Sequence, residues 1–402
     1  MLKMEKTGVI SLFFFMGLLA SCGSQERKMQ ESILPVIDLE AEYPSKEITL
    51  QDVADIQYIP LETNDNVLLS NKVKVSSISD KGIMVTGDDR IWLFDSNGKA
   101  LRCINNKGNA PGNYNRIDEV DVDWQSGYIF IKELQIPKIH VYTLEGEAVR
   151  DITFSQEEWE NGWLGEINHY NSDYLLAARN FIGEGSPSDL DLPACAPYLF
   201  IDKESGRQDT LNGYIQRLKA NTHLLIGGSM MILGDYTRRT IVKCGNDFYL
   251  SHLSSDTVFA LKEEGRFEPI LVRTPSYTTK EGQKQYLLLE SVTDPYLFVS
   301  KLKSAYELVD GTAYTNSNPH MIYDRRTGET FLYQFNNNDF ATQKIGEFDF
   351  VRAPKNSVYL LLSAEDLVTA LEEGNLNGEL KKVAKRLRLD DNPVLMLIRW
   401  NC

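Results

Sequence analysis

The stretch IDEVDVDWQSGYIFIKELQIPKIHVYTLEGEAVRDITF, residues 117–154, contains four short runs rich in β-branched and aromatic residues. The runs cover residues 117–123, 128–132, 138–143 and 148–154. Turn residues such as Gly127 and Gly146 separate them, and the alternation of Val120 and Val122 places apolar side chains on one face of a strand. This pattern predicts one four-stranded antiparallel sheet.

The same strand and turn recur along the chain. Five segments share the pattern: IWLFDSNGK (91–99), IHVYTLEGE (139–147), PYLFIDKESGR (197–207), TVFALKEEGR (257–266) and HMIYDRRTGE (320–329). Their turn glycines are Gly98, Gly146, Gly206, Gly265 and Gly328. Successive glycines are 48, 60, 59 and 63 residues apart, which fits one four-stranded propeller blade plus a loop. Unrelated hairpins of a β-sandwich are the alternative interpretation.

A sixth blade has to combine both ends of the chain. Residues 348–352, 357–362 and 393–400 are typical of three strands. We expect the fourth strand from DIQYIPLE, residues 55–62, paired beside residues 394–399. Pairing the first and last strands removes the free edges of a ring and couples its two ends.

Helical spacing is confined to residues 363–387, between the strands of the last blade. Ser363 begins a sequence that resembles a capping box, and Leu367 and Leu371 share one helical face. We expect two short helices that cover the last blade, with partner binding as the alternative. The predicted fold is therefore all-β: a six-bladed β-propeller of four-stranded antiparallel blades, closed by N- and C-terminal strands that share the last blade, with a short helical insertion near the C-terminus.

The first residues are typical of a secretory signal, with a basic start, an apolar run at 9–19 and small residues at 20–21. The run is shorter than the about 20 residues that span a bilayer. Leu19–Cys22, LASC, resembles the lipobox of bacterial lipoproteins, which implies cleavage before Cys22 and its acylation, with palmitate as an expected acyl group. An ordinary signal with an unrelated cysteine is the alternative. We divide the chain into a lipoprotein signal peptide (1–21), a lipidated flexible tether (22–45) and the propeller (46–402).

Residues 106–147 are similar to an NHL-type propeller repeat. They carry a G-x-x-P-G loop at residues 108–112, the aromatic Tyr114, an alternating strand and a glycine turn. With YIPLE at 58–62 and DNPVLMLIRW at 391–400, the chain resembles the six-bladed NHL-like β-propeller lipoproteins of Bacteroidota. The resemblance implies an outer membrane lipoprotein, on the periplasmic face or the cell surface. Only one blade has the complete G-x-x-P-G loop.

The charge and cysteine content of the chain limit the kinds of partner and metal site that we expect. The net charge is −15, and removing Lys3, Glu5 and Lys6 with the signal makes it −16. An acidic surface repels phosphate backbones, so we expect no nucleic-acid partner. The five cysteines are Cys22, Cys103, Cys195, Cys244 and Cys402. No two have the C-x-x-C spacing of a zinc site, and both disulfides and free thiols remain open.

Motifs for catalysis are missing from the sequence. It has no H-x-x-x-H pair, no G-x-S-x-G elbow, no EF-hand loop and no phosphate-binding loop, so we predict no catalytic residue, no metal and no cofactor. His140 and His320 occupy comparable third-strand positions, and we expect them near the channel. They could bind a shared metal, or they could be ordinary histidines of the strands without a functional role. Asp121 and Asp123 alternate on a strand and are expected to face water.

Aromatic residues in the loops are the better candidates for ligand binding. The candidate residues are Tyr114, Arg116, Trp159 and Trp163. Aromatic rings beside acids can stack on sugar rings, whereas packing between blades is the alternative. We hypothesise a monomeric, membrane-anchored, non-catalytic binding or scaffold protein with a glycan or protein partner, in glycan uptake or sensing by resemblance alone. The alternative is a propeller hydrolase or lyase, with or without a metal, acting on a sugar, lactone or peptide-derived substrate.

Overall fold

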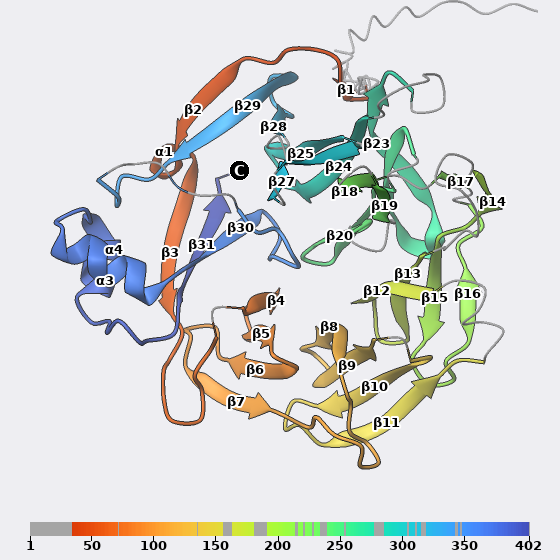
Figure 1. Ribbon diagram of the computed structural model, residues 1–402, viewed down its shortest axis with the longest axis horizontal. Coiled ribbons are helices and arrows are strands. Elements are labelled where there is room, and N and C mark those ends of the chain that lie inside the picture. The colour runs from red at the N-terminus through yellow and green to blue at the C-terminus, as the bar shows by residue number, and fades with distance from the viewer. Residues whose placement is uncertain are drawn as a thin grey trace, which may run out of the picture. The chain divides into compact units, whose positions relative to one another are not determined.

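The structure is a computed structural model in which residues 34–401 are described, with gaps. The gaps are residues 71, 135, 156–162, 181–190, 214–215, 220–221, 227–228, 234–238, 253–254, 277–284, 304, 310–311, 315–318, 342–344 and 346–347. In this part of the chain the strands form a ring of six blades (Figure 1), as predicted. In blades 1 to 5 the first strand lies nearest the central channel, and in blade 6 this place is taken by β30 (Ser357–Leu362).

The first two blades consist of consecutive antiparallel strands. Blade 1 contains β4 (Lys74–Ile78), β5 (Ile83–Gly87), β6 (Arg90–Phe94) and β7 (Ala100–Ile104). Blade 2 contains β8 (Ile117–Asp123), β9 (Tyr128–Glu133), β10 (Lys138–Thr143) and β11 (Ala148–Thr153). The strands of blade 2 agree with the sequence prediction to within one residue at each end.

Blades 3 to 5 follow the same order. Blade 3 contains β12 (Trp163–His169), β13 (Tyr174–Asn180), β15 (Tyr198–Asp202) and β16 (Gln208–Thr210). Blade 4 contains β20 (Ile241–Cys244), β21 (Asp247–Leu250), β22 (Thr257–Leu261) and β23 (Phe267–Thr274), with the 3₁₀ turn η2 (Glu263–Gly265). Blade 5 contains β24 (Gln285–Val292), β25 (Tyr296–Lys303), β28 (His320–Asp324) and β29 (Glu329–Asn336).

The turn glycines have the backbone conformation that the repeat required. All five have φ between +72° and +85°, the left-handed region that glycine enters without strain. Gly98 also lies against β3 (Ala54–Pro60), since a Cβ there would come 2.2 Å from the carbonyl oxygen of Pro60. A side chain at Gly98 would therefore push the first blade away from the last.

Blade 6 closes the ring with both ends of the chain, which confirms the predicted closure. Its strands are β30 (Ser357–Leu362), β31 (Val394–Trp400) and β3. β3 pairs antiparallel with β31 over seven residues, from Ala54 opposite Trp400 to Pro60 opposite Val394. The predicted strand at 348–352 is reduced to one bridge between Asp349 and Tyr359, because the chain turns at Arg352, where φ is +48°.

The N-terminal segment continues along the outside of two further blades. β1 (Val36–Asp38) adds a parallel strand to β23, and β2 (Ser45–Thr49) adds one to β29. The short helix α1 (Leu50–Val53) then leads into β3. Ile37 and Leu39 are completely buried. The expected tether therefore extends too far at residue 45, because the chain is already part of the propeller from residue 34.

Two small sheets are additions that the sequence did not predict. One pairs β14 (Asp191–Cys195) with β17 (Gln216–Lys219). The other contains β18 (Thr222–Ile226), β19 (Ser229–Leu233), β26 (Ala305–Val309) and β27 (Thr312–Tyr314). The parallel pairing of β18 with β26 joins the connection between blades 3 and 4 to a loop of blade 5.

The helical insertion is present where the sequence placed it. α3 (Ala364–Glu372) begins after Ser363, whose hydroxyl accepts a hydrogen bond from the Asp366 N–H at 3.3 Å. α4 (Gly378–Ala384) follows, and Leu380 packs with Val394 of the last blade. Across the described residues, no helix is long and apolar enough to span a membrane.

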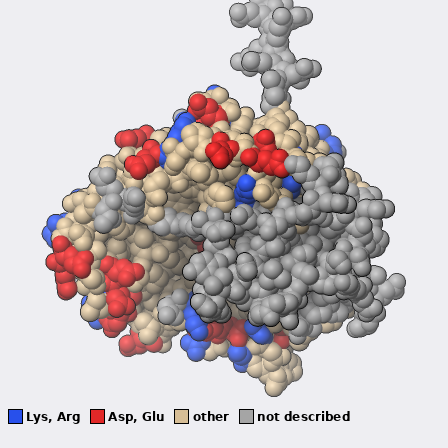
Figure 2. Space-filling model, turned by 45° about the horizontal axis from the view of Figure 1, so that its top comes forward, with Lys and Arg blue, Asp and Glu red and all other residues tan. Residues whose placement is uncertain are grey.

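Adjacent blades pack face to face through large apolar side chains. Between blades 5 and 6 the buried rings of Phe298, Phe335, Phe348 and Trp400 form one cluster. The ring centroids of Phe335 and Trp400 are 5.3 Å apart. Burying one such side chain contributes about 1.5–3 kcal/mol, so these contacts hold neighbouring blades together. On the face shown in Figure 2, acidic side chains gather in several patches with basic side chains between them.

Candidate functional site

Arg352 crosses the channel and connects four blades. Its Nε donates to Asn168 Oδ1 at 3.1 Å, and its Nη2 donates to the Ile167 carbonyl at 2.6 Å, both on β12. Nη1 donates to the carbonyls of Val120 on β8 and, at 3.4 Å, Ser76 on β4. A single guanidinium from blade 6 therefore satisfies carbonyls on the innermost strands of blades 1, 2 and 3.

Asp121 is the anionic centre of the channel. It is fully buried, and its Oδ2 accepts hydrogen bonds from Lys243 Nζ at 2.9 Å and from the backbone N–H of His169 at 2.7 Å. Burial alone would raise the pKa of Asp121, but the charges of Arg352 and Lys243 outweigh it and lower the pKa to about 2. The expectation that Asp121 faces water is wrong, because the polar face of an innermost strand points to the channel.

His169 is held neutral beside a buried lysine. Lys203 Nζ donates to His169 Nδ1 at 2.9 Å, to the Asn171 carbonyl at 2.6 Å and to Asp123 Oδ2 at 3.3 Å. An ammonium can only donate, so Nδ1 of the imidazole carries the lone pair and Nε2 carries the proton. Burial, reinforced by the charge of Lys203, lowers the pKa of His169 to about 4.

Acidification is expected to destabilise the fold through His169. Its pKa is about 4 in the folded protein and 6.5 ordinarily, so the unfolded chain binds more protons between these values. The contribution of His169 is fully present above pH 6.5 and is lost as the pH falls towards 4, with a magnitude on the order of 3 kcal/mol. Urea unfolding between pH 7 and 4 measures it. His169→Gln should flatten the decline, and an unchanged slope in the variant would contradict the assignment.

Two cavities lie along the channel. The first, called here the channel cavity, has a volume of about 500 Å³, and the second has about 640 Å³. Lys243 and Arg352 line both cavities, so their side chains lie between them. The second cavity includes Trp124, whose indole N–H donates to Ser77 Oγ at 3.1 Å, and His169.

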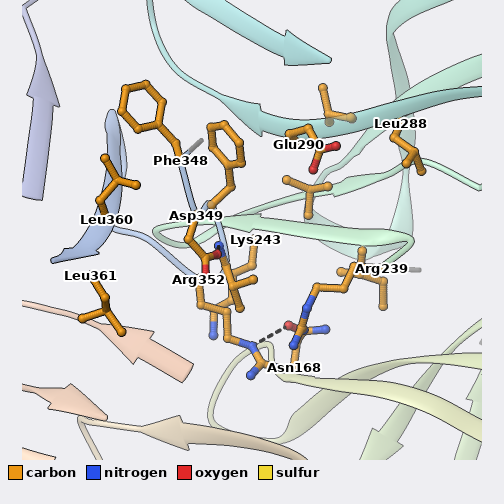
Figure 3. A pocket seen from close by; sticks show the side chains of 15 residues that line it. Asn168, Arg239, Lys243, Leu288, Glu290, Phe348, Asp349, Arg352, Leu360 and Leu361 are labelled. Carbon is orange, nitrogen blue, oxygen red and sulfur yellow. Dashed lines mark hydrogen bonds between the residues drawn. The ribbon is translucent and has the colours of Figure 1, made fainter. Parts of the chain in front are cut away.

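The channel cavity has polar and apolar walls (Figure 3). Its polar lining consists of Asn168, Arg239, Lys243, Arg352, Glu290 and Asp349. Phe348, Leu360 and Leu361 lie together on the side away from Arg239. Glu290 lies across the cavity from Asn168. The cavity therefore offers donors at one end and an apolar surface beside them.

Within the described part of the chain, two buried polar atoms of β12 have no hydrogen-bond partner. Glu166 Oε1 accepts three bonds from Thr240 and Ile241, at 2.7, 2.9 and 2.9 Å, whereas Oε2 accepts none. Burial raises the pKa of Glu166. Asn168 Nδ2 likewise finds no acceptor, although its Oδ1 holds Arg352. A buried donor without a partner costs free energy, and a ligand that accepts from it recovers that cost.

The structure does not bring the predicted ligand-loop residues together. Tyr114 is fully buried, donates to the Asp89 carbonyl at 3.0 Å and packs against Tyr142, so the packing interpretation is correct for it. Arg116 is exposed in the loop between blades 1 and 2. Trp159 lies outside the described residues. Trp163 begins β12, but its side chain also lies outside them.

The two histidines are not channel-proximal, contrary to the sequence prediction. His140 is buried on β10, where its ring nitrogens lie 2.9 Å from Glu133 Oε2 and 2.7 Å from Asp151 Oδ1. His320 is on β28. Both strands are third from the channel, on blades 2 and 5. Among the described residues, no group of three or more His, Cys, Asp or Glu side chains could hold a metal.

Only some of the cysteines lie in the described part of the chain. Cys103 is half-buried and Cys244 is buried, and both are free thiols. Burial raises the pKa of each thiol. Cys22 and Cys402 lie outside the described residues, as does the side chain of Cys195.

Comparisons with known proteins support the fold and identify the family. No curated protein matches the chain. The crystal structure of a protein described as exported, from Bacteroides fragilis NCTC 9343, has a TM-score of 0.60 and 14% identity, covering 91% of this chain and 100% of the other. A DUF4221 family member from Bacteroides vulgatus ATCC 8482 has a TM-score of 0.49 and 10% identity, covering 87% and 97%. The family model of the domain of unknown function DUF4934 matches residues 34–399, and the chain belongs to this family.

Proposed function

We propose that the protein is a non-catalytic binding protein that holds one small amphipathic ligand in the channel cavity. The observation that carries the proposal is the cavity itself, of about 500 Å³, with donors at one end and Phe348, Leu360 and Leu361 beside them. Small-molecule sites are typically concave, about 300–1,000 Å³ in volume, and mostly apolar with a few convergent polar groups. Arg352 and Lys243 line this cavity and also the second cavity of the channel.

The titratable groups at the channel support binding over catalysis. General acid–base catalysis is most effective when the pKa lies near the working pH. The pKa of Asp121 is about 2 and that of His169 about 4, so both are poor proton-transfer groups near neutrality. Glu166 has a raised pKa, but one of its oxygens already accepts three hydrogen bonds. These values favour the binding function over the hydrolase or lyase alternative.

We also propose that the protein is a monomeric lipoprotein of the outer membrane, anchored through acylated Cys22. The signal-like residues 1–21 and the lipobox support export, and the structural neighbour from Bacteroides fragilis is described as exported. Exposure on the periplasmic face or the cell surface fits equally well. A glycan or protein partner in uptake or sensing is compatible with this location.

Filling the channel cavity is expected to weaken ligand binding at least about tenfold. Leu360→Trp would place a larger side chain in the cavity, from a half-buried position that can accept it. Fluorescence of the neutral probe N-phenyl-1-naphthylamine measures binding. We expect the Leu360→Trp variant to bind the probe at least about tenfold more weakly, because at least one buried ring contact with the probe is lost.

Leu389→Trp is the matched control, since Leu389 is 59% exposed and lies outside the cavity. It should bind the probe as the parent does, and thermal melting should show that both variants are folded. Equal probe binding by Leu360→Trp and the parent would refute the channel cavity as the binding site.

A further inference from the structure

We propose that the channel cavity selects an apolar monocarboxylate, whose carboxylate accepts hydrogen bonds from Asn168 Nδ2 and Arg239. This inference rests on the proposed function and adds the chemical class of the ligand.

Asn168 supplies the first reason. Its side chain is 1% exposed and lines the cavity, and its Nδ2 has no hydrogen-bond partner among the residues that the structure describes. The orientation of the amide is fixed, because Oδ1 accepts from Arg352 Nε at 3.1 Å and a guanidinium can only donate. The group that remains is therefore an unfilled donor, which calls for an acceptor on the ligand.

Arg239 supplies the second reason. A guanidinium has five N–H donors in a planar fork. Among the described residues, Arg239 donates through Nη2 alone, to Glu119 Oε1 at 3.2 Å and Oε2 at 3.3 Å. Charge-assisted bonds from arginine suit a carboxylate in particular. Glu119 partly neutralises the guanidinium. The free energy that a ligand carboxylate gains from a bond to Arg239 is therefore expected at the lower end of the range for charge-assisted hydrogen bonds.

The acids of the cavity limit the ligand to one negative charge. Glu290 Oε1 accepts from the Ser300 hydroxyl at 2.5 Å, and Asp349 Oδ1 accepts from the Val351 N–H at 2.9 Å. Glu290 lies across the cavity from Asn168 (Figure 3). A second anionic group reaching that side would meet like charge. A dicarboxylate should therefore bind less well than a monocarboxylate of similar length.

The apolar wall defines the rest of the ligand. Phe348 and Leu360 line the cavity on the side away from Arg239 (Figure 3). An aromatic or branched aliphatic body would cover them, while its carboxylate reaches the donors. The combination predicts preference for molecules such as arylalkanoates over their neutral or cationic counterparts.

Displacement of N-phenyl-1-naphthylamine from the purified full chain tests the inference. The competitors are 4-phenylbutyrate, 4-phenylbutanamide, 4-phenylbutan-1-ol and the dicarboxylate suberate. We expect 4-phenylbutyrate to bind about tenfold more tightly than the alcohol, as one charge-assisted hydrogen bond allows. Suberate should bind more weakly than 4-phenylbutyrate.

Two cavity variants should reduce this preference. Arg239→Met removes the charge at similar volume and should bring the affinities of 4-phenylbutyrate and the alcohol to within about twofold. Asn168→Asp keeps the acceptor for Arg352 but replaces the free donor by a negative charge, and should weaken the carboxylate more than the alcohol. Arg207→Met is the matched control, because Arg207 is 66% exposed and pairs with Asp209 at the edge of blade 3. It should keep the preference of the parent.

The outcomes separate the inference from the proposed function. If the probe binds and Leu360→Trp weakens its binding as expected, but the alcohol competes as well as the carboxylate, the cavity is the site and the monocarboxylate assignment is wrong. If the probe does not bind in the cavity at all, both the function and the ligand class are overturned. A carboxylate preference that survives Arg239→Met and Asn168→Asp would also overturn the assignment.

Discussion

Deleting β3, residues 54–60, is expected to abolish the cooperative unfolding of the propeller. β31 would lose a ladder of seven residue pairs, and blade 6 would keep an open edge. Ala54 and Ile59, both buried, would leave the clusters that join blade 6 to its neighbours. The loss should exceed the whole stability of a typical domain, about 5–15 kcal/mol. Differential scanning calorimetry of the full chain would show no cooperative transition.

A control and a rescue make this result specific. Deleting residues 24–30 removes the same number of residues from the segment before the propeller and should leave the transition unchanged. A peptide of residues 34–62 contains β1, β2 and β3, and adding it in trans should restore part of the transition. A β3 deletion that melts like the parent would show that closure of the ring does not depend on this strand.

Replacing Arg352 with methionine should lower the free energy of unfolding by about 3–5 kcal/mol, the usual effect of removing one partner from a buried charged network. The carbonyls of Ser76, Val120 and Ile167 would each lose a donor. Asp121 would keep Lys243 but lose the nearby guanidinium, whose Nε lies 3.6 Å from its Oδ2. Urea denaturation measures the change.

Arg207→Met serves as the control for Arg352→Met, since it removes the same group from an exposed position. It should change the free energy of unfolding by less than about 0.5 kcal/mol. Arg352→Lys retains the charge with fewer donors and should fall between the parent and the methionine variant. If Arg352→Met unfolds at the same urea concentration as the parent, the guanidinium does not hold the blades together.

The blades could be predicted from the sequence because their signals are local. Strand alternation and a glycine turn lie within about ten residues of each other, so the pattern around Gly146 defines three strands without knowledge of the rest. The closure of the ring could also be predicted from the sequence, because residues 55–62 and 393–400 each have the pattern of a strand that needs a partner. β1 and β2 were missed because they are only three and five residues long, and Ile37 is the single buried residue in the two strands.

The channel site could not be predicted in the same way. Arg352 is a single arginine in a loop, and its partners Asn168 and Ser76 are 184 and 276 residues distant. The signal in the sequence that could have indicated the site is Asp121, because it lies on the first strand of a blade. The polar face of such a strand points into the channel and not to the solvent. Tyr114 and the histidines were misassigned because their residue types are suggestive, whereas only burial and strand position decide their roles.

The pairing of β3 with β31 sets a condition on biosynthesis. Pro60 lies opposite Val394, so 334 residues must be made after Pro60 before its partner exists. At about 5–20 residues per second, synthesis leaves β3 without its partner for tens of seconds. A chain that stops early, for example through a nonsense codon in the last blade, exposes this strand permanently. Proteases and chaperones that recognise unpaired strands would then distinguish incomplete chains from finished ones.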